Sequence, residues 1–491
     1  MGREFPEISD ADGGFPPDGP CALHAPAHLN AVAVTNGFVP RGLAPGYAWA
    51  DFAPGDGLNA ALHAAANPDG AFFAVGCAGR PTPHAAHVGN LACDPDDLPP
   101  LDFAVFDGGF AHLADAERAR RLDRVVAALK PGGILLLGYH ALPGFAAMMP
   151  LRDVLYSLDQ GHDRTPEKRV RAAFEWLDAA DAAGAPFLHQ HPGVRRRLAA
   201  LAARSAATAE TELFGARLRP LHFAQVATSA MAAGMSFCGN AAMRRNMVDL
   251  LLPPGTRGLL QRANKRTTLE TLCDALANPF YRRDVYVKGK PLADEARYWR
   301  LHDELVIGLS PDAPPGVDLG HARVSFSAFP FDALAEGLAA GPRRVAGIAG
   351  LIPEIARDAA RSALALGFAA AAPAPADSRV PPAGGGVAVP LPLNRALLAE
   401  AFHAHGPLTL ACPLTGGFVG LDRGAAIALD AIVSGDVDPA RAEDAIAARL
   451  AALAGHAEAG DTFRAAARES LAALTPGRLA TLARFGVVAG T

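Results

Sequence analysis

The stretch YAWADFAPGDGLNAALHAAAN, residues 47–67, decides the fold of this chain. It opens with a short apolar run, turns at Ala53-Pro-Gly-Asp-Gly57 and continues into residues that favour a helix. Glycines in such a turn let the backbone approach a ligand, and the helix that follows presents free N–H groups and a positive dipole end. The stretch therefore predicts a strand, a ligand-binding turn and a helix.

The acid before this turn sets the loop apart from a dinucleotide-binding loop. Asp51, Ala53, Gly55 and Gly57 give the spacing D/E-x-G/A-x-G-x-G, whereas the usual NAD-binding loop reads G-x-G-x-x-G with an acid about twenty residues later. An acid in this place can orient an ammonium group or a water molecule. The spacing favours S-adenosylmethionine over NAD, and the alternative is a loop that only turns the chain.

Apolar runs alternate with helical segments as far as residue 140. After the first strand, further strands are expected at 71–75, 90–93, 101–106 and 134–138. Helices are expected at 26–37, 58–66, 84–89 and 114–130, the last of them stopped by Pro131-Gly-Gly133. Five strands that alternate with helices predict a doubly wound α/β domain.

Two later runs, 234–238 and 283–288, are expected to return to the same sheet, which makes it Rossmann-like and seven-stranded. Arg282 and Arg283 are expected on a solvated strand face, with a phosphate clamp as the alternative. The helix and strand order after residue 300 is that of a winged helix. The expected division is a flexible lead-in over 1–24, an α/β core over 25–145 and 221–295, a helical insertion over 146–220, a winged-helix-like domain over 300–371, a linker over 372–388 and a mostly helical C-terminal domain over 389–491.

Charge argues against a nucleic-acid partner. The chain has 491 residues, with 45 Lys and Arg against 50 Asp and Glu and a net charge of −5. No basic block is longer than Arg195-Arg196-Arg197, and binding to nucleic acid through charge needs a clustered basic face. We therefore expect no nucleic-acid partner.

Cysteine and histidine spacing argues against a metal site. No two of the six cysteines form a C-x-x-C pair, and the histidine pairs 84/87, 189/191 and 403/405 have no neighbouring carboxylate or cysteine.

The first thirty residues are acidic and rich in Pro and Gly, and no run of about 18 apolar residues occurs. We expect no metal, no membrane insertion and a cytoplasmic location.

Three stretches carry a resemblance to a known family: residues 47–67, LKPGGILLLGYHALPGFAAMM at 129–149 and NPFYRRDVYVKG at 278–289. The chain resembles bacterial class I S-adenosylmethionine-dependent methyltransferases with a methyltransferase regulatory domain, which include protein-lysine methyltransferases of the rickettsial type. The resemblance covers most of the chain. It implies S-adenosylmethionine as the cofactor, a protein acceptor or partner, and a regulatory role for the winged-helix-like domain.

The chain departs from the family at the cofactor. Ala53 stands where the first loop glycine is usual, and Gly76-Cys77 stands where the family has the acid that holds the ribose. Losing a hydrogen bond to a charged group costs about 1.5–3 kcal/mol, which would weaken cofactor binding roughly ten- to a hundredfold. Asp107, or the acids at 94, 96 and 97, are candidates to replace that contact.

Candidate site residues follow from the motifs and the resemblance. Tyr139 and His140, at the end of the fifth strand, and Asp107, at the end of the fourth, are the catalytic candidates, with a helix-capping or surface role as the alternative for His140. The cofactor-binding candidates are Asp51, Ala53, Gly55, Gly57, Gly76, Cys77 and Asp107.

Three functions remain open at this point. The first is a methyltransferase that transfers a methyl group in line to a protein lysine or another large acceptor. The second is a catalytically decayed methyltransferase fold that serves as a binding or assembly module, and the missing ribose acid at Gly76 motivates it. The third is an enzyme that uses this fold with a different small molecule. The sequence leaves the oligomeric state open.

Overall fold

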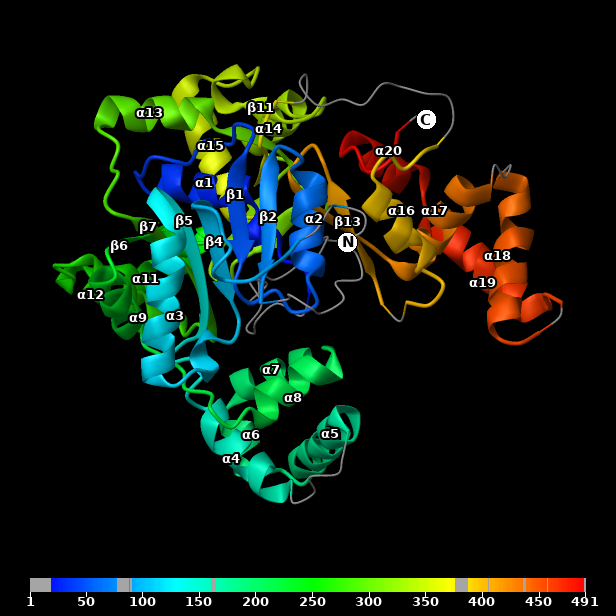
Figure 1. Cartoon of the computed structure of the whole chain (residues 1–491), viewed down its shortest axis with the longest axis horizontal. Coiled ribbons are helices and arrows are strands. Elements are labelled where there is room, and N and C mark those ends of the chain that lie inside the picture. The colour runs from blue at the N-terminus through cyan, green and yellow to red at the C-terminus, as the bar shows by residue number, and fades with distance from the viewer. Residues whose placement is uncertain are drawn as a thin grey trace.

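A mixed β-sheet with helices on both faces forms the centre of the molecule (Figure 1). The computed structural model describes residues 19–76, 88, 91–159, 165–375, 387–404, 406–435, 439–456 and 458–489. The strand order is β3-β2-β1-β4-β5-β7-β6. The strands are β1 (Tyr47–Asp51), β2 (Gly70–Val75), β3 (Ala92–Cys93), β4 (Leu101–Asp107), β5 (Leu129–His140), β6 (Met235–Asn240) and β7 (Tyr281–Lys288). Six of these are five residues or longer, and β3 is a two-residue strand at the sheet edge.

Strand directions gather the candidate site at one edge of the sheet. The strands from β3 to β5 are parallel, and β7 runs antiparallel to both β5 and β6. The last residue of β5, His140, therefore faces Tyr281, the first residue of β7. The sequence expectation that residues near 235 and 285 return to the first sheet is confirmed.

Both faces of the sheet are covered, as the continuous apolar strands predict. Along β5, Leu136 belongs to one core cluster and Leu135 and Leu137 to the other. Helices α1 (Pro26–Thr35), α2 (Leu58–Ala66) and α3 (Asp115–Ala128) form where helices are expected. Helix α3 ends at Ala128, so the segment at Pro131 does not stop a helix but lies inside β5, where the pairing register to β4 shifts. Most of the helix expected over 84–89 lies outside the described residues.

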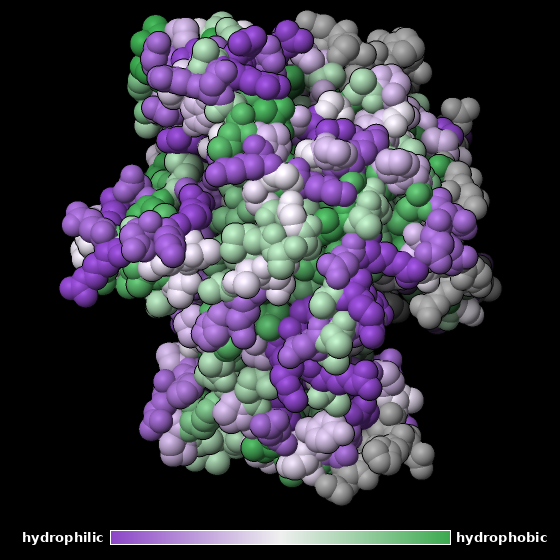
Figure 2. All heavy atoms as spheres, turned by 60° about the vertical axis from the view of Figure 1, so that its left-hand side comes forward, coloured by the Kyte–Doolittle hydropathy of each residue, from purple (hydrophilic) through white to green (hydrophobic). Residues whose placement is uncertain are grey.

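The helical insertion forms a separate lobe below the sheet (Figure 1). Its helices are α4 (Met148–Leu158), α5 (Pro166–Ala182), α6 (Pro186–Gln190), α7 (Pro192–Ala202) and α8 (Ala206–Phe214). In the space-filling view the molecule narrows between this lobe and the body above it, and hydrophilic and hydrophobic surface alternate in small areas (Figure 2). After the insertion the chain returns to the sheet through α9 (Phe223–Ala232), and α10 (Val248–Leu251), α11 (Pro254–Arg257) and α12 (Arg266–Ala277) lie between β6 and β7.

Residues 295–375 form a small α/β unit beside α1. A three-stranded antiparallel sheet has the order β11-β8-β12, and a separate hairpin joins β9 and β10. The winged-helix assignment of this unit stays a prediction. Its elements are α13 (Glu295–Glu304), β8 (Val306–Leu309), β9 (Gly316–Asp318), β10 (Arg323–Ser325), α14 (Phe331–Gly337), β11 (Arg343–Arg344), α15 (Pro353–Ala365) and β12 (Ala369–Ala371).

The C-terminal part is mainly helical, as expected, but it contains a hairpin that the sequence analysis did not identify. The hairpin packs against α2, where Asn67 Nδ2 donates to the Gly416 carbonyl at 2.8 Å and the rings of His63 and Phe418 are 4.5 Å apart. The elements are α16 (Pro392–Ala399), β13 (Leu408–Cys412), β14 (Gly417–Leu421), α17 (Arg423–Gly435), α18 (Pro439–Leu453), α19 (Asp461–Ala473) and α20 (Pro476–Arg484).

The N-terminal boundary needs a correction. The lead-in was expected to extend to residue 24, and residues 1–18 lie outside the described part of the chain. Ala22–His24, however, form a 3-10 turn, and His24 is 2% exposed. His24 is fixed because polar groups at the ends of the strands bind it, as described below. Among the described residues, no helix is long and apolar enough to cross a membrane.

Candidate functional site

The glycine-rich turn between β1 and α2 has the open backbone that the motif predicts. Gly55 and Gly57 have positive φ values of 58° and 86°, and a Cβ added at Gly55 would meet no atom within 4 Å. Gly57 is also the N-cap residue directly before α2, so the free N–H groups of the helix face this turn. The turn therefore leaves room for a ligand beside polar backbone groups.

Asp51 is hydrogen-bonded to both sides of this turn. One carboxylate oxygen accepts from the Ala53 amide and the other from Asn59 Nδ2, both at 2.9 Å. The side chain is buried, and burial raises the pKa of Asp51, while His24 and the two hydrogen bonds act in the opposite direction. In this arrangement Asp51 ties the end of β1 to the loop and to the first turn of α2.

Asp107, at the end of β4, is the centre of a buried polar network. Its Oδ2 lies 2.8 Å from His24 Nε2 and 2.6 Å from Arg283 Nε, and its Oδ1 accepts from the Tyr281 hydroxyl at 2.8 Å. A Cβ on Gly138 would lie 1.9 Å from Asp107 Oδ1 and 2.6 Å from the Tyr281 hydroxyl. Only glycine at this place in β5 therefore leaves room for the side chain of Tyr281, on β7, to bond to Asp107, on β4. The Asp107 side chain has no exposed surface.

The network holds opposite charges. Burial opposes ionisation of Asp107, but Arg283 and His24 outweigh it and keep the pKa of this carboxyl well below its usual range. Burial also opposes the charge on His24, yet Cys21 and Asp107 raise the pKa of His24 to about 10. Arg283, expected on a solvated face, is instead 6% exposed and paired. Its neighbour Arg282 is 1% exposed and pairs with Glu270, Asp274 and Asp284.

Tyr139 and His140 are also buried, at 0% and 1% exposure. The Tyr139 hydroxyl donates to Asp284 Oδ2 at 2.5 Å, and burial next to Asp284 raises the pKa of Tyr139. His140 Nε2 lies 2.8 Å from Glu212 Oε2, which comes from α8 of the insertion. Neither side chain meets solvent in this structure, so the expected direct contact with an acceptor needs a correction.

A cavity of about 920 Å³ lies at the ends of β2 and β4 against α3. Gly76 is on its wall with a φ of 82°, and a Cβ added there would meet no atom within 4 Å. Cys77 lies outside the described residues. The lining residues are Phe52, Val75, Gly76, Pro95, Phe106, Glu117, Arg120, Arg121, Asp123, Arg124 and Val125.

Two acids line this wall, Glu117 and the exposed Asp123, and both belong to α3. Asp107, one candidate to replace the ribose acid, is fully enclosed and engaged by three protein donors. Asp96, another, has an exposed side chain that accepts from Arg124 at 2.6 Å. Glu117 on α3 is held by Arg120 and Arg121, and these hydrogen bonds lower the pKa of Glu117 to about 2.

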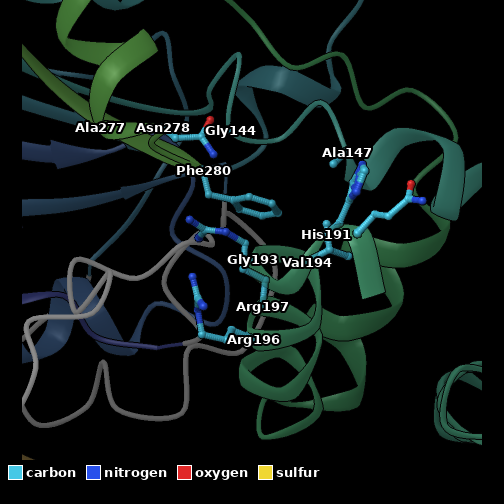
Figure 3. A pocket seen from close by; sticks show the side chains of 11 residues that line it. Gly144, Ala147, His191, Gly193, Val194, Arg196, Arg197, Ala277, Asn278 and Phe280 are labelled. Carbon is cyan, nitrogen blue, oxygen red and sulfur yellow. The ribbon is translucent and has the colours of Figure 1, made fainter. Parts of the chain in front are cut away.

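A second cavity, of about 610 Å³, separates the insertion from the turn before β7 (Figure 3). Arg196 and Arg197 of α7 extend toward it, and the Arg197 guanidinium lies 4.1 Å from the centre of the Phe280 ring. Gly144 and Asn278 form the opposite wall. This cavity is close to the end of β5, because Ala141 bonds to the Phe280 carbonyl.

Sequence reasoning missed His24, Cys21, Tyr281 and Glu212. His24, Tyr281 and Glu212 are remote in sequence from the residues that they contact, and Cys21 neighbours His24. Of the four, only Tyr281 lies in a motif, the stretch at 278–289. Arg282-Arg283 was the available signal. Adjacent side chains of a strand point to opposite faces, and a strand with apolar neighbours is rarely solvated on both faces, so a pair of arginines here predicts at least one buried ion pair.

Comparison with known proteins places this geometry in a known fold. PKMT2 from Rickettsia typhi superposes with a TM-score of 0.69 at 13% identity, over 97% of this chain and 100% of that chain. PKMT2 in complex with AdoHcy gives a TM-score of 0.68 at 13% identity, over 96% and 100%. The chain has the fold of a class I S-adenosylmethionine-dependent methyltransferase.

Two sequence comparisons extend this result. Residues 211–288 match a family described as a predicted methyltransferase regulatory domain. This match runs from the end of α8 to β7, and not over residues 300–371, to which the sequence analysis gave the regulatory role. An uncharacterized protein of Synechocystis, sll1526, is 24% identical over 194 residues, which is 40% of this chain and 38% of that protein.

Proposed function

We propose that this chain is an S-adenosylmethionine-dependent methyltransferase that acts on a lysine amine of a protein or on another large acceptor. The observation that carries the proposal is the turn at Gly55 and Gly57, which Asp51 at the end of β1 joins to the first turn of α2. It lies within a fold that matches PKMT2 over nearly its whole length, including the form with AdoHcy.

The residues present fit such a cofactor. The open turn offers backbone N–H groups for a carboxylate, and the cavity beside Gly76 has a volume in the usual range for small-molecule sites. Phe52, Val75 and Phe106 would hold the nucleoside, and the turn would hold the methionine end. S-adenosylmethionine, when bound, supplies a methyl group on a sulfonium, which is open to attack by a nucleophile.

Tyr139, His140 and Asp107 act in this proposal as positioning residues. Their buried side chains join β5 to β7, β5 to α8 and β4 to β7 respectively. Methyl transfer depends mainly on alignment of the nucleophile and exclusion of water. These pairs hold the edge of the sheet rigid, and a rigid edge helps to align the nucleophile with the methyl group.

We place the acceptor on the insertion side. The cavity between α7 and Phe280 opens beyond β5, where open α/β sheets bind substrates. Arg196 and Arg197 on its wall suit an acceptor with acidic groups near the methylated residue. The family match over 211–288 includes Ala277, Asn278 and Phe280 of this wall, and we assign these residues to acceptor contact.

The alternative function is a catalytically decayed methyltransferase fold that serves as a binding or assembly module. One observation favours it: Gly76 lacks a carboxylate, and Asp107 is enclosed. The winged-helix character of residues 300–371 and a cytoplasmic location also stay predictions.

Two assays separate these functions. Calorimetric titration with S-adenosylhomocysteine measures binding, and transfer of a labelled methyl group to proteins of a bacterial lysate measures activity. The proposal expects binding and label on protein. Binding without transfer to any protein, or absence of binding, contradicts the proposal and supports the decayed module.

A further inference from the structure

Three metal-ligating side chains meet where the insertion touches the sheet. His112 follows β4 in the turn Phe110–His112, His140 ends β5, and Glu212 belongs to α8. One ligand atom from each lies within 4.8 Å of the other two. We propose that this His112–His140–Glu212 cluster binds one Zn²⁺ ion per chain and locks α8 onto the sheet.

The donor atoms suit such an ion. Two imidazoles and one carboxylate with an open fourth position are a known ligand set for zinc. Ligands bound at about 2.0–2.1 Å in a tetrahedron lie roughly 3.3 Å apart, and His140 Nε2 and Glu212 Oε2 are 2.8 Å apart. A small outward movement of these two groups makes room for the ion, which replaces the proton between them.

Unpartnered nitrogens give independent support. His112 Nε2 and His140 Nδ1 are buried and have no hydrogen-bond partner in the described part of the chain. A buried imidazole nitrogen without a partner is costly, and an ion held between His140 Nε2 and Glu212 Oε2 would give His112 Nε2 a partner, although not His140 Nδ1. Arg152 donates to the backbone carbonyl groups of Glu212 and Gly215, and its charge also acts on His112 and Glu212.

The second group of possible ligands in the described residues does not share these properties. Cys21, His24 and Asp107 also lie within 4.8 Å of one another. There, Arg283 Nε is 2.6 Å from Asp107 Oδ2 and already supplies a positive charge. An added cation at that place would be repelled, so Cys21 provides a matched control.

The cluster was not visible in the sequence. His112, His140 and Glu212 are 28 and 72 residues apart in sequence order, and neither spacing belongs to a metal-binding motif. The expectation of no metal rested on the histidine pairs close in sequence. The fold alone brings these three donors together.

Zinc content of the full chain, purified without an affinity tag and dialysed against ZnCl₂, tests the proposal. Wild type and Cys21→Ser should each retain about one Zn²⁺ per chain, whereas His112→Ala and Glu212→Gln should bind it about a hundredfold or more weakly. Loss of zinc from Cys21→Ser with retention in His112→Ala would overturn the proposal, as would absence of bound zinc in wild type.

Cobalt gives a readout that does not depend on variants. Co²⁺ added to the metal-free wild type should produce the visible absorption bands of a tetrahedral site with nitrogen and oxygen ligands, and one equivalent of Zn²⁺ should remove them. The spectrum of hydrated octahedral Co²⁺ alone would contradict a metal site at this cluster.

Discussion

Arg283 and Asp107, 176 residues apart in the chain, form a buried ion pair at 2.6 Å across the glycine at position 138. The pair joins β7 to β4, although β5 lies between these strands. It therefore holds the returning strand in register with the strand that ends at the candidate site. His24 completes the pair from the N-terminal segment.

Removing one partner of this pair should be costly. Arg283→Met leaves the Asp107 carboxylate buried with only His24 and Tyr281, and we expect a loss of about 3–5 kcal/mol in the free energy of unfolding. The double variant with Asp107→Asn should recover part of that loss, because the buried carboxylate is removed together with its guanidinium partner. Urea unfolding of the two single variants and the double variant measures this. If the loss of unfolding free energy in the double variant equalled the sum of the losses in the two single variants, Arg283 and Asp107 would not be coupled.

His63 should make stability depend on pH. Burial and the nearby charge of His24 lower the pKa of His63 from 6.5 to about 3. Since the unfolded chain binds the proton more readily, the stability that His63 contributes is present above pH 6.5. It is lost as pH falls toward 3, by up to about 1.4 kcal/mol per pH unit.

The matched variant for this test is His63→Phe, which keeps a ring against Phe418. The stability difference between wild type and variant, measured by urea unfolding at pH 7, 6, 5 and 4, should move in favour of the variant as pH falls. A difference that stays constant with pH would exclude a buried neutral imidazole.

Restoring an acid at position 76 should affect stability and binding in opposite ways. Gly76 has a φ of 82°, so Gly76→Asp should lower the free energy of unfolding by about 1–2 kcal/mol. The new side chain has open space, and a carboxylate there should tighten S-adenosylhomocysteine binding about tenfold or more. Gly76→Asn carries the same strain without the charge and should not tighten binding as much. Equal affinities for the two variants would contradict a ribose contact at this position.

Arg196 should affect the acceptor and not the cofactor. It lines the cavity beside Phe280, whereas Arg195 on the same helix pairs with Asp181 and does not line it. We expect Arg196→Glu to raise the KM for a protein acceptor about tenfold, with S-adenosylhomocysteine affinity unchanged. Arg195→Glu should change neither quantity. Similar KM values for the two variants would place the acceptor elsewhere.

Local patterns predicted most of the fold. The strands, the turn at Gly55 and the return of residues near 285 to the sheet follow from apolar runs and glycines that act over a few residues. The hairpin at 408–421 was missed because its strands are short and lie between helical stretches.

The candidate site was less predictable, because its groups meet only in three dimensions. Asp107 was read as free to bind ligand, since nothing near it in sequence reveals Arg283 or His24. The sequence predicts His140 as a catalytic candidate, with a helix-capping or surface role as the alternative, because nothing near it in the chain reveals Glu212 of the insertion. Burial of a polar side chain depends on partners remote in sequence, and a single sequence does not display them.

The most direct test of the account is the affinity of the chain for S-adenosylhomocysteine, measured by calorimetry on wild type, Gly55→Val and Gly350→Val. Gly350 has a positive φ of 83° and open space around it, so its variant carries matched backbone strain in the unit at 295–375 and not in the β1–α2 turn. We predict one bound molecule per chain for wild type and for folded Gly350→Val, and no measurable binding for folded Gly55→Val. Equal binding by Gly55→Val and wild type, or no binding by wild type, would contradict the assignment of the β1–α2 turn as the cofactor site.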